Sequence, residues 1–157
     1  MTVDGRHLFV WRHADAGPPF LDREQDFERT LTARGIGDAL KTANWLRQRL
    51  PEEFRLLSSP APRAWQTACQ LGQPEVLQNL APDRSVHQLL PDLAELWPNR
   101  AVPVVLVGHL PSVGDLIQSL VDTPDSGLLV IQKSSVFCVQ QQDNARELVP
   151  DLSFSLN

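Results

Sequence analysis

The sequence predicts an α/β protein, a three-layer α/β/α sandwich around a mostly parallel central sheet. Short apolar runs alternate along the chain with segments of helical periodicity, which is the pattern of successive strand–helix units. The run AVPVVLVGH at 101–109 is almost entirely apolar and β-branched, as expected of a strand buried on both faces. The length of 157 residues suffices for one hydrophobic core, so we expect a single domain over 1–157.

The composition is that of a globular, soluble protein and excludes several classes. The net charge of −5 argues against a nucleic-acid-binding protein. The first ten residues lack the apolar core of a signal peptide, and no apolar run is long enough to span a membrane. We therefore expect a cytoplasmic protein without a membrane partner; the oligomeric state stays open. Cys69 and Cys138 fit no metal or redox spacing and are expected to be buried thiols.

The expected strands are short and bounded by turn residues. They span 7–11, 54–59, 74–80 and 101–109, and a hairpin is expected over 128–141. The polar segment 17–30 is rich in proline and charge and is expected to be a loop.

The expected helices follow these strands, at 31–51, 63–71, 85–96 and 111–122. The first carries one apolar stripe, formed by Ile36, Leu40, Ala43, Leu46 and Leu50. Thr32 is its expected N-cap and Pro51 its stop. Pro60 and Pro62 suit the first turn of the second helix, whereas Pro91 should kink the third or mark its start.

Three of the expected strands lead into basic or imidazole side chains. Arg12 and His13 follow the first strand, Arg63 follows the second, and His109 follows the strand at 101–109. In open α/β sheets, ligand sites form beyond the carboxyl ends of the strands. Two arginines and two histidines there suit a phosphate dianion, because guanidinium groups form paired charge-assisted hydrogen bonds. Each residue alone could be an ordinary surface or turn residue, but their joint position is unexpected by chance.

Two other kinds of site fit the sequence poorly. A metal site lacks ligands, because the histidines form no HxxxH or HxH pair and His7 and His87 lie in different contexts. A serine acyl-transfer triad lacks its GxSxG segment.

Four motifs resemble those of the histidine phosphatase superfamily, whose fold is phosphoglycerate-mutase-like. RHADAG is similar to its RHG signature, with Ala14 in place of the glycine; LTARGIGDA, SSPAPRAWQTA and VGHLPSVGDL are similar to three further segments. They occur in the family's order and cover residues 8–118. The short length and GHLPSVGDL most resemble the SixA-type phosphohistidine phosphatases, which implies a compact fold without a large inserted cap.

The resemblance implies a metal-independent phosphohydrolase without a cofactor. His13 would attack phosphorus and carry a transient phosphohistidine. Arg12, Arg63 and His109 would bind the phosphate oxygens and stabilise the transition state. The implied substrate is a phosphorylated histidine-containing protein; a small phosphorylated molecule is the alternative. A phosphate- or phosphoprotein-binding module without turnover is a third possibility.

The chain departs from the family at the general acid, because Asn79 stands where a glutamate is expected. Asp15 and Asp83 are nearby candidates for this acid but match no motif. Asp15 is alternatively a residue that orients an arginine or caps a turn. An alkoxide leaving group needs a proton, whereas imidazole, with a reference pKa near 6.5, can leave neutral. The missing acid therefore favours phosphohistidine. The acidic segment 21–29 is expected to be a solvated loop, with a lid or a docking surface as alternatives.

Overall fold

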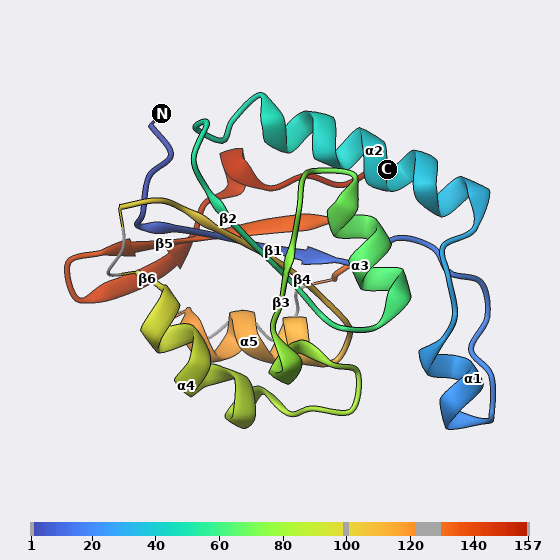
Figure 1. Ribbon diagram of the computed structural model, residues 1–157. Coiled ribbons are helices and arrows are strands. Elements are labelled where there is room, and N and C mark those ends of the chain that lie inside the picture. Colours follow the sequence, from blue (N-terminus) through green and yellow to red (C-terminus); the bar gives the residue numbers. More distant parts are fainter. Residues whose placement is uncertain (1, 99–100, 122–129, 157) are drawn as a thin grey trace.

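A computed structural model describes residues 2–98, 101–121 and 130–156 (Figure 1). Its strands form one sheet in the order β3-β2-β4-β1-β5-β6. Their bounds are β1 His7–Arg12, β2 Arg55–Ser58, β3 Glu75–Val76, β4 Val104–Gly108, β5 Val136–Gln142 and β6 Ala145–Leu148. The first four run parallel, β5 pairs antiparallel with β1, and β6 pairs antiparallel with β5. The prediction of a mostly parallel sheet is confirmed.

The helices lie on both faces of this sheet (Figure 1). Their bounds are α1 Arg23–Phe27, α2 Ala33–Arg47, α3 Pro62–Cys69, α4 Val86–Leu96 and α5 Ser112–Leu120, with 3-10 turns at Gln78–Leu80 and Pro150–Leu152. Helices α2 and α3 cover one face, α4 and α5 cover the other, and α1 lies beyond the carboxyl ends of the parallel strands (Figure 1). The three-layer prediction is confirmed. Within the described ranges no helix has the length and apolarity needed to cross a bilayer.

The sheet separates two hydrophobic cores, one on each of its faces, and strand β1 contributes side chains to both. Phe9 and Trp11 belong to the core beneath α2 and α3, whereas Leu8 and Val10 belong to the core beneath α4 and α5. Successive side chains of a strand point to opposite faces, so β1 is buried on both. The register places Arg12 opposite Gly108, so that the segments after β1 and β4 start at the same edge of the sheet.

Helix α2 begins as predicted but turns a different face to the core. Thr32 is its N-cap and accepts a hydrogen bond from the Gly35 N–H. The helix ends at Arg47, before Pro51, and Ile36 and Leu40 are exposed. The buried face consists of Gly35, Ala39, Thr42, Ala43 and Leu46. Gly35 lets the start of α2 approach the loop after β1, because a Cβ at this position would lie 2.0 Å from the Asp15 carbonyl oxygen.

The predicted hairpin at 128–141 is wrong. Residues 128–129 lie outside the described residues, and 130–135 form no strand; the observed hairpin pairs β5 with β6. The segment before β5 instead holds the end of β1, because the Ser134 N–H donates to the Arg12 carbonyl and the Arg12 N–H donates to the Ser135 carbonyl.

Smaller differences concern the ends of elements and one thiol. Segment 17–30 contains the short helix α1, which Asp22 caps by accepting from the Gln25 N–H. The strand expected at 74–80 is reduced to β3 and a 3-10 turn. Pro91 lies inside α4 rather than at its start. Cys138 is buried as predicted, but Cys69 is exposed.

Candidate active site

The four residues predicted to bind phosphate lie together at the carboxyl edge of the sheet. Arg12 ends β1, His13 follows it, Arg63 lies in the first turn of α3, and His109 follows β4. The ring centroids of His13 and His109 are 5.0 Å apart, at an interplanar angle of 53°. Both arginines lie close enough for their charges to lower the pKa of both histidines. We call these four residues the Arg-His cluster.

His13 is held with one ring nitrogen free for chemistry. Its Nδ1 lies 2.7 Å from the Ala14 carbonyl oxygen. A carbonyl only accepts, so Nδ1 carries the hydrogen and Nε2 keeps its lone pair. Burial, together with the nearby arginines, lowers the pKa of His13 to about 4 despite the hydrogen bond to Ala14. The ring is therefore neutral and nucleophilic at neutral pH.

In His109 the other ring nitrogen is bonded: Nε2 has a partner in the protein, and Nδ1 has none among the described residues. Its Nε2 lies 2.8 Å from the Ser59 hydroxyl oxygen, which also accepts a 3.1 Å hydrogen bond from the Ala61 N–H. With the amide bonded to that oxygen, the hydroxyl hydrogen of Ser59 can point to Nε2, which places the ring hydrogen of neutral His109 on Nδ1. Burial first, and then the charges of His13 and the arginines, lower the pKa of His109 to about 2. His109 is thus a neutral donor.

Three buried N–H donors of this cluster have no partner. In the part of the chain that the structure describes, five buried side-chain polar atoms lack a hydrogen bond: His7 Nε2, Arg12 Nε, Arg63 Nε, Trp97 Nε1 and His109 Nδ1. A buried unsatisfied donor costs about 1–3 kcal/mol, so native proteins rarely retain one without a reason. The three in the cluster suit one anion with several oxygens, such as phosphate.

The two arginines are fixed by backbone carbonyls. Arg12 Nη1 donates to the Ile131 carbonyl at 2.9 Å, and Arg63 Nη1 donates to the Asp26 carbonyl at 2.9 Å. Burial lowers the pKa of both guanidinium groups, which nevertheless stay protonated in proteins. Each therefore presents a positioned cation.

Arg29 is a third arginine near the cluster that the sequence analysis missed. Its Nε donates to Asp26 Oδ1 at 2.8 Å and its Nη1 to the Gly17 carbonyl at 2.8 Å, which leaves the side chain 12% exposed. Its charge contributes to the lowered pKa of both His13 and His109. In the sequence it stands in an apparently solvated loop, and no feature separates it from the other arginines there.

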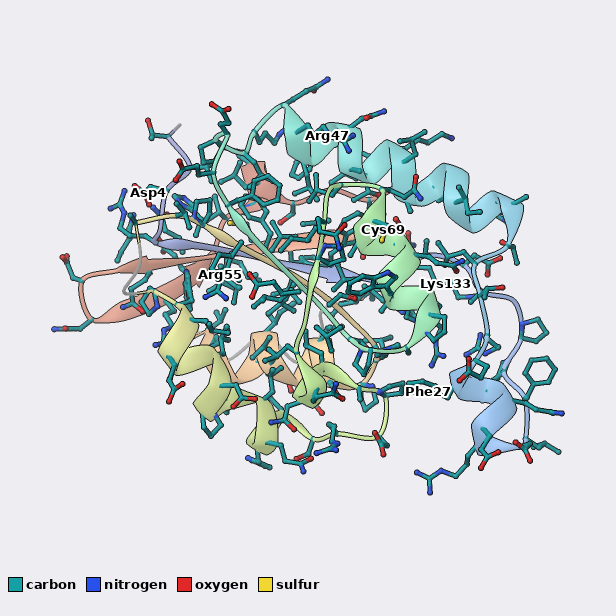
Figure 2. All side chains as sticks on the ribbon, in the orientation of Figure 1. Asp4, Phe27, Arg47, Arg55, Cys69 and Lys133 are labelled. Atoms are coloured by element: carbon teal, nitrogen blue, oxygen red, sulfur yellow. The ribbon has the colours of Figure 1, made fainter. Side chains whose placement is uncertain are left out.

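Asp15 bonds to Lys133 and Thr32 and not to the arginines of the cluster. Its carboxylate accepts from Lys133 Nζ at 2.9 Å and from Thr32 Oγ1 at 2.8 Å, and these bonds hold its pKa below the usual range. Lys133 lies near the carboxyl end of β1 (Figure 2). Asp15 thus joins the loop after β1 to the start of α2 and to the segment before β5.

Asp26 is a carboxylate at the edge of the cluster, 3.9 Å from Arg63. Burial raises its pKa, but the Phe20 N–H, the hydrogen bond from Arg29 and the charges of both arginines outweigh burial and lower it overall. Asp26 therefore carries a charge at neutral pH and is poorly suited to donate a proton.

Asn79 and Asp83 lie on the segment before α4. Asn79 Nδ2 donates to Asp92 Oδ2 at 2.7 Å and its Oδ1 accepts from Arg84, so the amide ties this segment to α4. The Asp83 side chain is 60% exposed and lies 4.0 Å from Arg23. In the ranges the structure describes, no group of three His, Cys, Asp or Glu side chains is placed to hold a metal ion.

The fold is that of a histidine phosphatase. The solved structure of the protein histidine phosphatase SixA complexed with tungstate superposes with a TM-score of 0.77 at 29% identity, covering 91% of this chain and 94% of that chain. The phosphohistidine phosphatase SixA of Escherichia coli K12 is 35% identical over 120 residues, which are 72% of this chain and 73% of the relative. A SixA homologue of Haemophilus influenzae is 28% identical over 128 residues, 73% of this chain and 76% of the relative.

A scan against family models finds no match. The chain belongs to the SixA family of the histidine phosphatase superfamily.

Proposed function

We propose that this protein is a phosphatase that removes phosphate from phosphohistidine in another protein, with His13 as the nucleophile. The observation that carries the proposal is the neutral His13 beside three buried N–H donors without partners. Membership of the SixA family supports the same activity. A solved relative is complexed with tungstate, a tetrahedral oxyanion like phosphate, which supports the binding of such an anion.

The first step transfers the phosphoryl group. Nε2 of His13 attacks phosphorus, the P–N bond of the substrate breaks, and the substrate imidazole leaves with the electron pair. Arg12, Arg63 and His109 donate to the phosphate oxygens and stabilise the charge of the transition state. Phosphohistidine protonated at its distal nitrogen leaves as neutral imidazole, so the step does not depend on a strong acid.

The second step returns the enzyme to its starting state. Water attacks the phosphorus of phosphorylated His13, the P–Nε2 bond breaks, and the water proton leaves with inorganic phosphate or passes to solvent. The hydrogen bond from Nδ1 to the Ala14 carbonyl keeps the ring in one orientation through both steps.

A substrate panel tests the proposed function. Phosphorylated histidine-containing phosphotransfer proteins are offered beside small alkyl and aryl phosphates, with and without a chelator. We expect hydrolysis of phosphohistidine, slow turnover of alkyl phosphates, a steep dependence of aryl phosphate rates on leaving-group pKa, and no effect of the chelator.

The variant His13→Ala is expected to be inactive. The matched control is His87→Ala, which changes an exposed histidine of α4 and is expected to be fully active. Preferred hydrolysis of alkyl phosphates would favour a small-molecule phosphomonoesterase, and binding without turnover would favour a binding module. Strong inhibition by the chelator would contradict the metal-independent mechanism.

The cytoplasmic location and the single domain over 1–157 stay predictions. Cell fractionation tests the location, and limited proteolysis tests the single domain.

A further inference from the structure

A hollow of about 650 Å³ lies beside the Arg-His cluster, between α1 and the segment before α4. Its lining residues are Phe20, Leu21, Arg23, Glu24, Asp26, Phe27, Glu28, Pro82 and Asp83. Helix α1 stands apart from the layers around the sheet, on the side to which the parallel strands point (Figure 1). The proposed mechanism uses none of the side chains that line this hollow.

The hollow borders directly on the proposed phosphate site. Arg63 Nη1 donates to the Asp26 carbonyl at 2.9 Å and to the Phe27 carbonyl at 3.5 Å, and both residues line the hollow. Figure 2 shows Phe27 between α1 and the body of the protein. A phosphohistidine held by Arg63 would therefore bring the protein surface around it against the hollow.

Apolar side chains stand open to solvent on this segment. Phe20 is 54% exposed and Leu21 is 105% exposed, although large apolar side chains are usually covered in a folded protein. Exposed apolar side chains that line a hollow rimmed by polar groups mark interaction sites.

The polar lining of the hollow is mainly acidic. Asp26 and Asp83 each lie within 4.0 Å of an arginine of this chain. Glu24 and Glu28 are exposed on and just after α1, and the chain as a whole has a net charge of −5. The charges around the hollow therefore complement a basic partner, and such complementarity steers association.

We propose that this hollow docks the surface of the phosphorylated partner protein next to its phosphohistidine. That surface presents an apolar side chain to Phe20 and Leu21 and a lysine or arginine to Glu24 and Glu28. The inference rests on the proposed function and extends it, because it assigns selection of a protein substrate to a segment outside the Arg-His cluster.

The test compares a protein substrate with a minimal one. Leu21→Ser and the double variant Glu24→Lys/Glu28→Lys are assayed on a phosphohistidine-containing phosphotransfer protein with a basic residue near its phosphohistidine, and on free phosphohistidine. For each variant we expect kcat/KM on the protein to fall by about 10-fold, mainly through KM, because hot-spot contacts contribute this much. On free phosphohistidine we expect no change, and added salt should reduce the effect of the charge reversal.

Matched controls lie elsewhere on the surface. Leu40→Ser changes an exposed leucine on α2 and Glu52→Lys reverses an exposed charge after α2; both should act like the wild type on both substrates. Unchanged kcat/KM on the protein, or equal loss on both substrates, would overturn the docking proposal while leaving the proposed function intact. A wild-type protein that hydrolyses neither substrate would overturn both.

Discussion

At the scale of single residues, the hydrogen bond between Ser59 and His109 is the contact that orients a donor in the proposed phosphate site. Without the Ser59 hydroxyl, neutral His109 is free to carry its hydrogen on either ring nitrogen, and the donor at Nδ1 is present only part of the time. We predict that Ser59→Ala lowers kcat/KM by about 10-fold, as loss of one donor contact of about 1.4 kcal/mol would do. Ser59→Thr, which keeps a hydroxyl, should retain most activity.

Ring ¹⁵N NMR shifts of His109 distinguish this role from a merely structural one, because they report which nitrogen is protonated. Ser58→Ala is the matched control, since the Ser58 hydroxyl donates to the Ser59 carbonyl rather than to His109. An unchanged His109 spectrum in Ser59→Ala would show that the serine does not set the tautomer.

Arg63 and His109 are expected to act mainly in the transition state. Arg63→Ala and His109→Ala each remove a donor to the phosphate oxygens, and loss of one such donor typically lowers kcat by about 10²–10³. Thermal unfolding of both variants checks that the fold is intact. Full activity in a folded variant would remove that residue from the site.

At the scale of elements, the contact of α2 with the loop after β1 positions His13. A Cβ on Gly35 would lie 2.0 Å from the Asp15 carbonyl oxygen, so Gly35→Ala must push the loop and helix apart. We predict a loss of about 2–4 kcal/mol in the free energy of unfolding, as overpacking against backbone produces, with reduced activity.

Gly37→Ala on the same helix is the control for Gly35→Ala. A Cβ on Gly37 meets nothing within 4 Å, so this variant should be neutral or more stable by up to about 1 kcal/mol, because alanine favours a helix. Urea denaturation measures both changes. Equal effects of the two substitutions would contradict the close packing at Gly35.

The sequence predicts the elements and residues that depend on local pattern. The β-branched run at 104–108 and the turn after each strand are local features, and they suffice to bring Arg12, His13, Arg63 and His109 to one edge of the sheet. The buried face of α2 is not local, because close approach to the loop after β1 selects glycine and alanine over the larger Ile36 and Leu40.

Contacts between residues far apart in the sequence also explain the other differences between the predicted and the observed structure. The segment before β5 forms no strand, because its backbone groups bond to those of Arg12 and His13 instead. Asp26 joins the site because its carbonyl accepts from Arg63, and Arg29 is held by the Gly17 carbonyl; no spacing in the sequence encodes these longer-range contacts.

At the scale of the whole molecule, two buried neutral histidines link folding to pH. Burial holds the pKa of His13 at about 4 and that of His109 at about 2, whereas an unfolded histidine titrates near 6.5. Below pH 6.5 the unfolded chain therefore binds more protons than the folded one, and the free energy of unfolding falls as pH is lowered toward 4. The contribution of His13 to this fall is on the order of 2–3 kcal/mol.

Urea denaturation between pH 7 and pH 4.5 measures this dependence. The double variant His13→Gln/His109→Gln should lose much less stability over the same range, because it lacks both buried imidazoles. Parallel curves for wild type and variant would show that the two rings are not buried neutral in the folded protein.

The central claim is that phosphate passes through a covalent bond to His13 Nε2, and trapping that intermediate tests it most directly. The enzyme is mixed with a ³²P-labelled phosphohistidine protein, quenched within milliseconds in alkaline denaturant, and mapped by peptide mass spectrometry. We predict acid-labile, alkali-stable label on the peptide that contains His13, and no enzyme-bound label in His13→Ala. Label on another residue, or phosphohistidine hydrolysis that survives in His13→Ala, would contradict the account.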